Sequence, residues 1–143
     1  MVKLASWIIE KCYADIQIFQ QISVQEKAVL EAYLKRFSSV QDFLGAKVFP
    51  QLLEISGIGS IKMSEVLYAV EKEEIITSLD EWIELREVRN ALEHDYPDEL
   101  EQALKDLEFC INSFDKLSSY YLKTLEFSRK YIHETIWEIT TIN

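Results

Sequence analysis

Residues 78–100 read SLDEWIELREVRNALEHDYPDEL, and this stretch predicts where one helix begins and ends and where the next begins. Ser78 and Glu81 form a capping-box pattern, in which the two side chains satisfy backbone N–H groups at a helix start. Pro97 disfavours helical backbone at the residue before it, so the helix is expected to stop near residues 94–95. Pro97 also suits the first turn of a following helix. The stretch therefore predicts two helices joined by a short break.

Similar signals predict helices on both sides of this stretch. Ser23 and Glu26 form another capping-box pattern. Pro50 is expected to kink the chain or to restart a helix, because proline has no backbone N–H. Segment 56–60 holds two glycines and is interpreted as a loop, since it lacks the third glycine and the preceding strand of a phosphate-binding motif. The predicted helices cover about residues 2–22, 23–44, 64–75, 78–95 and 98–131.

The last of these helices has apolar residues at a seven-residue period, which is typical of a helix that buries one stripe of its surface. The residues expected to face inward are Leu100, Leu104, Leu107, Ile111, Phe114, Tyr121 and Leu125. Residues 132–143 are amphipathic but uncapped, so they are interpreted as a loosely ordered tail.

Composition supports a helical protein of one domain. The chain has 143 residues, of which 48% are hydrophobic and 28% charged, and only 3 are Gly and 2 are Pro. So few turn residues argue against a fold of many short strands. Long helices joined by tight turns must pack antiparallel. The predicted fold is therefore all-α, an up-and-down four-helix bundle with an extra short helix, in a single domain over residues 1–143.

Charge and cysteine content limit the possible partners. Fifteen Lys and Arg against 25 Asp and Glu give a net charge of −10, so generic nucleic-acid binding is disfavoured and no DNA partner is expected. Cys12 and Cys110 form no metal-binding pattern and are interpreted as buried free thiols in a reducing cytoplasm. No apolar stretch approaches the ~20 residues of a membrane span, so no membrane association is predicted.

An arginine interrupts the apolar stripe of the helix after Ser78. The residues on this stripe, spaced three and four apart, are Trp82, Leu85, Arg89, Leu92 and Tyr96. Burying a guanidinium without partners costs several kcal/mol. Arg89 is therefore expected to reach the edge of the stripe, to pair with a carboxylate, or to face a cleft.

Two further polar residues lie near Arg89 on this helix. Asn90 and His94 are four apart and share a second face. His94 lies five residues from Arg89, roughly 140° around an ideal helix. A break at the helix end or a second copy of the chain would be needed to aim both side chains at one phosphate.

Residues 89–96, Arg-Asn-Ala-Leu-Glu-His-Asp-Tyr, resemble the Arg-Asn-x-x-x-His-x-Tyr signature of the HEPN superfamily. They are most similar to the HepT branch, small helical proteins encoded beside a minimal nucleotidyltransferase. The flanking segment 81–87 and Pro97 are similar to that family's usual surroundings. The specific part of the resemblance spans about residues 64–97.

The resemblance implies a homodimer whose motif helices face each other across a cleft, and an endoribonuclease that needs no metal or other cofactor. Arg89 and His94 would be catalytic, with Asn90 as a supporting residue. The products would be a 2′,3′-cyclic phosphate and a 5′-hydroxyl. The resemblance also implies that a cognate nucleotidyltransferase antitoxin neutralises the toxin by adenylylating Tyr96.

The local charge argues against a ribonuclease and keeps other hypotheses open. Residues 80–101 carry Arg86 and Arg89 against nine acidic residues, a field that opposes RNA. One alternative is a non-catalytic, substrate-binding subunit of a two-protein nucleotidyltransferase. Another is a helical dimerisation protein in which Arg89 and His94 only form hydrogen bonds or ion pairs with each other or with nearby acidic residues.

Overall fold

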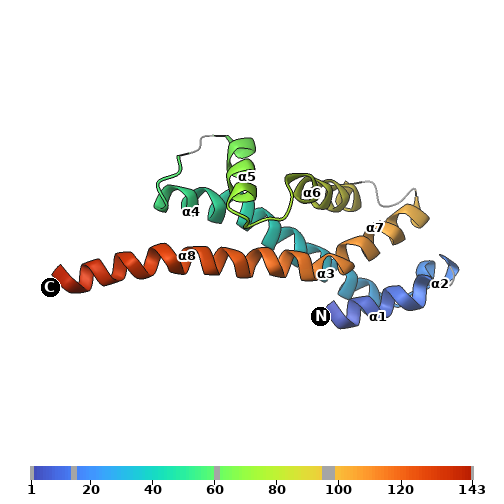
Figure 1. Cartoon of the computed structure of the whole chain (residues 1–143). Coiled ribbons are helices and arrows are strands. Elements are labelled where there is room, and N and C mark those ends of the chain that lie inside the picture. The colour runs from blue at the N-terminus through green and yellow to red at the C-terminus, as the bar shows by residue number, and fades with distance from the viewer. Residues whose placement is uncertain (1, 14–15, 60–61, 95–98, 143) are drawn as a thin grey trace. The chain divides into compact units, whose positions relative to one another are not determined.

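The fold is all-α: every secondary-structure element among the described residues is a helix (Figure 1). The structure is a computed structural model that describes residues 2–13, 16–59, 62–94 and 99–142. The helices are α1 (Val2–Tyr13), α2 (Ile16–Gln20), α3 (Val24–Phe43), the π-helical segment η1 (Leu44–Val48), α4 (Phe49–Ile55), α5 (Met63–Lys72), α6 (Leu79–His94), α7 (Leu100–Asn112) and α8 (Phe114–Ile142).

The chain divides into two compact units. Unit 1 comprises Met1–Gln41 and Ile83–Asp115, and unit 2 comprises Asp42–Trp82 and Lys116–Asn143. Because the boundaries fall within α3, α6 and α8, each of these helices contributes residues to both units.

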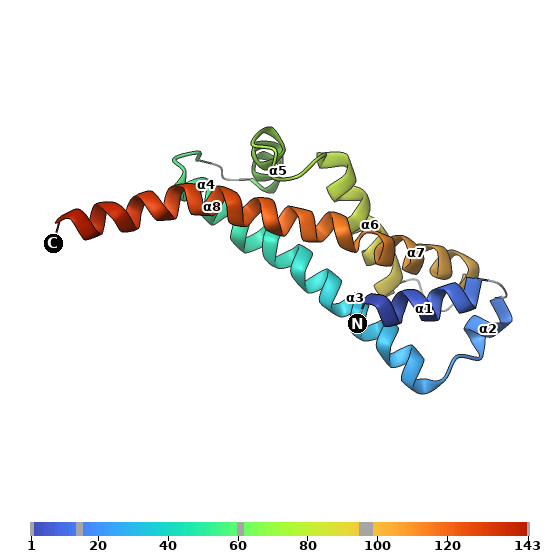
Figure 2. The same ribbon diagram turned by 60° about the horizontal axis from the view of Figure 1, so that its bottom comes forward.

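In unit 1, α1 packs against α2 and α7 (Figure 2). The single helix predicted over residues 2–22 is wrong, because α1 ends at Tyr13 and α2 begins at Ile16. Not all apolar residues of this segment are buried, because Leu4, Trp7 and Ile18 are exposed. The buried residues include Ala5, Ile8, Ile9, Cys12 and Phe19.

The start of α3 confirms the predicted capping box. The Glu26 N–H donates to Ser23 Oγ at 3.1 Å, and the Ser23 N–H donates to Glu26 Oε1 at 3.2 Å. Both bonds satisfy N–H groups that a helix start otherwise leaves to water. Local sequence therefore fixes where α3 begins.

The chain does not restart a helix at Pro50, because α3, η1 and α4 follow one another without a break and the residues that join them keep helical backbone angles. The Phe49 N–H donates to the Leu44 carbonyl, five residues back, and Pro50 occupies the first turn of α4. A proline at this point of a continuous α-helix would clash with the carbonyl four residues before it. The wider π-helical turn replaces that geometry.

Trp82 anchors the aromatic core of unit 2. Its ring centroid lies 5.2 Å from that of Phe49 and 6.0 Å from that of Tyr120. A Cβ at Gly45 would lie 3.0 Å from Trp82 Cζ2, so the missing side chain lets the indole approach the backbone of η1. Trp82, Phe49 and Tyr120 are all buried.

The helices α4 and α5 end with the same hydrogen-bond pattern. After α4, the Ile58 N–H donates to the Leu53 carbonyl at 2.8 Å, around Gly57 at φ +83. After α5, the Ile75 N–H donates to the Val70 carbonyl at 2.9 Å, around Glu74 at φ 61. Both ends are Schellman motifs, but only Gly57 is a residue that favours the left-handed conformation. Segment 56–59 is a loop, as predicted.

The helix predicted over residues 98–131 is in fact two helices separated by Ser113. The Ser113 N–H and Oγ both donate to the Phe109 carbonyl, at 3.0 and 2.7 Å. Serine competes for backbone acceptors in this way, which explains why it can end a helix. The buried stripe then shifts by one residue, so Leu117, Tyr120 and Thr124 are buried while Tyr121 is 49% exposed.

The helix α8 continues to Ile142, through most of the segment interpreted as a loosely ordered tail. No proline or glycine follows Pro97 in the sequence, so nothing local stops the helix. Over the part of the chain that the structure describes, no helix is both long and apolar enough to cross a membrane.

Candidate functional site

The apolar stripe predicted for α6 is buried as far as the structure describes it. Trp82, Leu85, Arg89 and Leu92 are 2%, 1%, 4% and 4% exposed. The fifth position, Tyr96, lies outside the described residues. The described part of α6 extends to His94, and residues 95–98, where Pro97 predicts the end of the helix, lie outside the described residues.

Arg89 is buried in unit 1 and is held by a main-chain group. Its Nη1 donates to the carbonyl oxygen of Ser38, on α3, at 3.0 Å. A carbonyl can accept this bond beside the helical one, since it has two lone pairs. A main-chain acceptor was not among the three environments predicted for Arg89, which were the edge of the stripe, a carboxylate partner and a cleft.

Ser38 also contacts the other end of the motif. Its Oγ donates to Glu93 Oε1 at 2.9 Å. One residue of α3 thus bonds to both Arg89 and Glu93, which lie four positions apart on α6. Ser38 was not predicted from the sequence, although a serine in the middle of a helix and next to the inward-facing Phe37 is a detectable signal.

The remaining motif residues are placed less fully. Asn90 is half-buried on α6. The backbone of His94 forms the last residue of α6, but the surroundings of its side chain lie outside what the structure describes. The convergence of Arg89 and His94 therefore stays a prediction.

Arg89 also affects a buried thiol of α7. Burial raises the pKa of Cys110 to about 12, Asp106 adds to the rise and the charge of Arg89 opposes it. Such a thiol is a poor nucleophile at neutral pH. Cys12 and Cys110 are both free and buried, as predicted, and they act as core residues.

A groove of about 710 Å³ lies in unit 1 beside the last turn of α6. Its lining includes Phe19, Lys27, Leu30, Glu31, Lys35, Leu92 and Glu93. Two lysines and two glutamates balance each other here, so the groove has no basic surplus for an RNA backbone.

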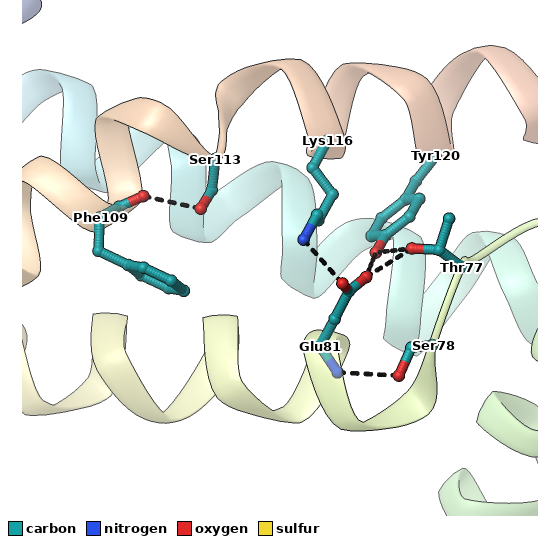
Figure 3. A network of polar contacts seen from close by, with 7 residues as sticks. All are labelled: Thr77, Ser78, Glu81, Phe109, Ser113, Lys116 and Tyr120. Atoms are coloured by element: carbon teal, nitrogen blue, oxygen red, sulfur yellow. Dashed lines mark hydrogen bonds and ion pairs between the residues drawn. The ribbon is translucent and has the colours of Figure 1, made fainter.

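A second polar cluster lies in unit 2, at the start of α6 (Figure 3). The carboxylate of Glu81 accepts a hydrogen bond from Thr77 Oγ1 at 2.6 Å and pairs with Lys116 Nζ at 3.1 Å. The Thr77 hydrogen bond and Lys116 hold the pKa of Glu81 below its ordinary value. The hydroxyl of Tyr120 lies 2.9 Å from Thr77 Oγ1, and burial raises the pKa of Tyr120.

This cluster confirms one half of the predicted capping box. The Glu81 N–H donates to Ser78 Oγ at 3.3 Å, as the pattern requires. The Glu81 side chain binds Thr77 and Lys116, and the Leu79 N–H donates to the carboxylate of Glu71 at 2.5 Å. A glutamate from α5 therefore helps to cap α6.

Comparisons with known proteins supply no further assignment. No family model, no curated protein and no solved structure matches the chain. Among the described residues, no group of three or more His, Cys, Asp and Glu side chains is arranged to hold a metal ion.

Proposed function

We propose that this chain is a HEPN-like, cytoplasmic toxin of a toxin–antitoxin pair and that it is a metal-independent endoribonuclease. The proposal includes an up-and-down four-helix bundle with an extra short helix, and a homodimer with its motif helices at a shared cleft. The observation that supports the proposal is the segment from Arg89 to Tyr96. Its first six residues form the last described part of α6, where Arg89 donates a hydrogen bond to the carbonyl of Ser38.

The proposed reaction uses the nucleophile that RNA carries. The 2′-hydroxyl attacks the adjacent phosphorus, His94 in its neutral form takes the proton, and the bond from phosphorus to the 5′-oxygen breaks. A protonated imidazole supplies the proton that the leaving oxygen needs. Arg89 donates to the phosphate as negative charge accumulates, with Asn90 in support. The products are a 2′,3′-cyclic phosphate and a 5′-hydroxyl.

The proposed antitoxin is a minimal nucleotidyltransferase that adenylylates Tyr96. The added AMP brings negative charge and bulk two residues from His94. It would repel RNA and fill the cleft.

Burial of Arg89 favours a second candidate function. A side chain that is 4% exposed and bonded to a main-chain carbonyl must move, or receive the RNA in a buried position, before it can contact a phosphate. A non-catalytic, substrate-binding subunit of a two-protein nucleotidyltransferase needs no such contact. In that case Arg89 is required for the fold and not for a reaction.

A combined growth and cleavage assay distinguishes the two candidates. The wild-type chain is expressed alone beside the Arg89→Ala and His94→Ala variants, with Arg86→Ala as an exposed control on the same helix. The nuclease predicts that wild-type and Arg86→Ala arrest growth and leave 2′,3′-cyclic phosphate ends, and that both motif variants do neither. The melting temperature of His94→Ala should match wild type, which separates loss of chemistry from loss of fold.

Two results would contradict the nuclease. One is harmless wild-type expression, and the other is cleavage of an RNA that carries a 2′-deoxy group at the cut site. Harmless expression, together with a gain of one AMP on Tyr96 when a nucleotidyltransferase is co-expressed, would support the binding subunit.

A further inference from the structure

Ser38 makes two separate contacts with the end of α6, each through a different atom. Its backbone carbonyl accepts from Arg89 Nη1 at 3.0 Å. Its hydroxyl donates to Glu93 Oε1 at 2.9 Å. The two bonds reach residues one helical turn apart, so they constrain both the position and the rotation of this turn relative to α3.

The two contacts differ in their surroundings, because Arg89 is buried whereas Glu93 is exposed. Ser38 is 6% exposed and Arg89 is 4% exposed, so water competes little for the bond between them. A serine within a helix usually donates to a carbonyl of its own preceding turn. The Ser38 hydroxyl donates instead to a carboxylate on another helix, and a bond to a charged acceptor is stronger than one to a neutral group.

We infer that Ser38 is a positioning residue for the motif at the end of α6. It holds Glu93, the neighbour of His94, in a fixed rotation, while its carbonyl holds Arg89. The inference rests on the proposed ribonuclease for its effect on catalysis, but the restraint on α6 itself does not depend on any activity. Ser38 contacts no substrate in this scheme and acts only through the motif residues.

Hydrogen exchange on the full-length chain tests the restraint. The variants are Ser38→Ala, which removes the hydroxyl but keeps the carbonyl, and Ser38→Thr, which restores a hydroxyl. Ser39→Ala is the matched control, because Ser39 is the exposed neighbour on the same helix. In Ser38→Ala the amides of residues 91–94 should exchange about five-fold faster, whereas those of α7 should keep their wild-type rates. Ser38→Thr and Ser39→Ala should match wild type.

RNA cleavage tests the consequence for catalysis. Ser38→Ala should lower kcat about five-fold and leave KM unchanged, since it loosens the motif without removing a substrate contact. Ser38→Thr should recover kcat, and Glu93→Ala should lower it without an additional loss in the double variant.

The outcomes separate this inference from the proposed function. Unchanged exchange in Ser38→Ala, or equally faster exchange throughout α3, α6 and α7, would overturn the positioning role. If the local change in exchange occurs but the wild-type chain cleaves no RNA, the ribonuclease fails and the restraint on α6 is supported.

Discussion

The two ends of α6 are fixed in different ways. At its start, in unit 2, the polar contacts of Glu81 lie outside the apolar stripe, and Trp82 packs among Phe49, Tyr120 and Gly45. Toward its end, in unit 1, the stripe itself contains a charge, because Arg89 is buried and bonds to Ser38. The first arrangement is what stability alone favours, since apolar groups are buried and charges stay near water.

This difference concerns what each end of α6 contributes to stability. A buried guanidinium contributes little that an apolar side chain of similar size would not, and it carries a desolvation penalty. The stability of the core therefore does not by itself explain why an arginine occupies this position. The following predictions test that distinction between the two ends.

The largest effect is expected from Trp82→Ala at the start of α6. Removing a buried indole that contacts two other aromatic rings should lower the free energy of unfolding by about 3–5 kcal/mol. Chemical denaturation measures the loss. Trp7→Ala is the control, because Trp7 is 57% exposed, and it should change stability by less than about 1 kcal/mol. Equal losses in both variants would contradict the anchoring role of Trp82.

The next largest effect concerns Arg89 at the other end. Arg89→Ala should lower the free energy of unfolding by about 2–3 kcal/mol, because it removes buried methylene groups and a charged donor to Ser38. Arg89→Met keeps much of the volume and should cost less than about 1 kcal/mol. Denaturation of both variants beside Arg86→Ala measures the difference. A loss in Arg89→Met as large as in Arg89→Ala would show that the guanidinium itself stabilises the core.

The sequence predicts the local features of both ends and misses the distant ones. The capping box at Ser23 and one half of the box at Ser78 depend on residues a few positions apart, so the local pattern contains those interactions. The break at Ser113 was missed because a heptad pattern continues across it and a single serine seldom ends a helix.

The contact between Arg89 and Ser38 could not be predicted, for a different reason. The contact joins residues 51 positions apart, and its acceptor is a main-chain carbonyl, a group that every residue carries. The sequence therefore identifies Arg89 as an unusual member of the apolar stripe, but it contains no signal that shows which carbonyl accepts the hydrogen bond from Arg89. Two polar residues of the facing helix, Ser38 and Gln41, are buried, and a polar residue beside the inward-facing Phe37 was an available sign of a polar site.

A smaller effect is expected at the turns that end α4 and α5, the second of which leads the chain toward the start of α6. Gly57→Ala should cost about 1 kcal/mol, because φ is +83 there and no atom lies within 4 Å of the added Cβ, so the cost is conformational. Glu74→Gly should stabilise the chain by about 0.5 kcal/mol. Glycine removes the strain of the left-handed conformation from the folded state, and this gain exceeds the cost of the larger conformational entropy that glycine gives the unfolded state. Thermal unfolding measures both, and opposite signs are expected. A destabilising Glu74→Gly would mean that the Glu74 side chain contributes more than its backbone conformation costs.

The smallest effect tests the polar cluster at the start of α6 by its dependence on pH. The folded state holds the pKa of Glu81 below 4.5, chiefly through Thr77 and then Lys116, so folding favours the charged carboxylate. The resulting stabilisation is complete above about pH 4.5 and is lost as the pH falls through the lowered pKa of the folded state. Glu81→Gln should therefore cost about 0.5 kcal/mol at pH 7, as is typical of partly exposed pairs, and the cost should shrink on acidification. The difference in melting temperature between Glu81→Gln and wild type, measured at pH 7 and at pH 3.5, tests this prediction.

Glu84→Gln, an exposed position on the same helix, is the control. Its difference in melting temperature from wild type should be the same at both pH values. If the melting temperature of Glu81→Gln changed with pH as that of wild type does, the cluster would not stabilise α6 through the charge of Glu81, and the start of the helix would depend on Ser78, Glu71 and Trp82.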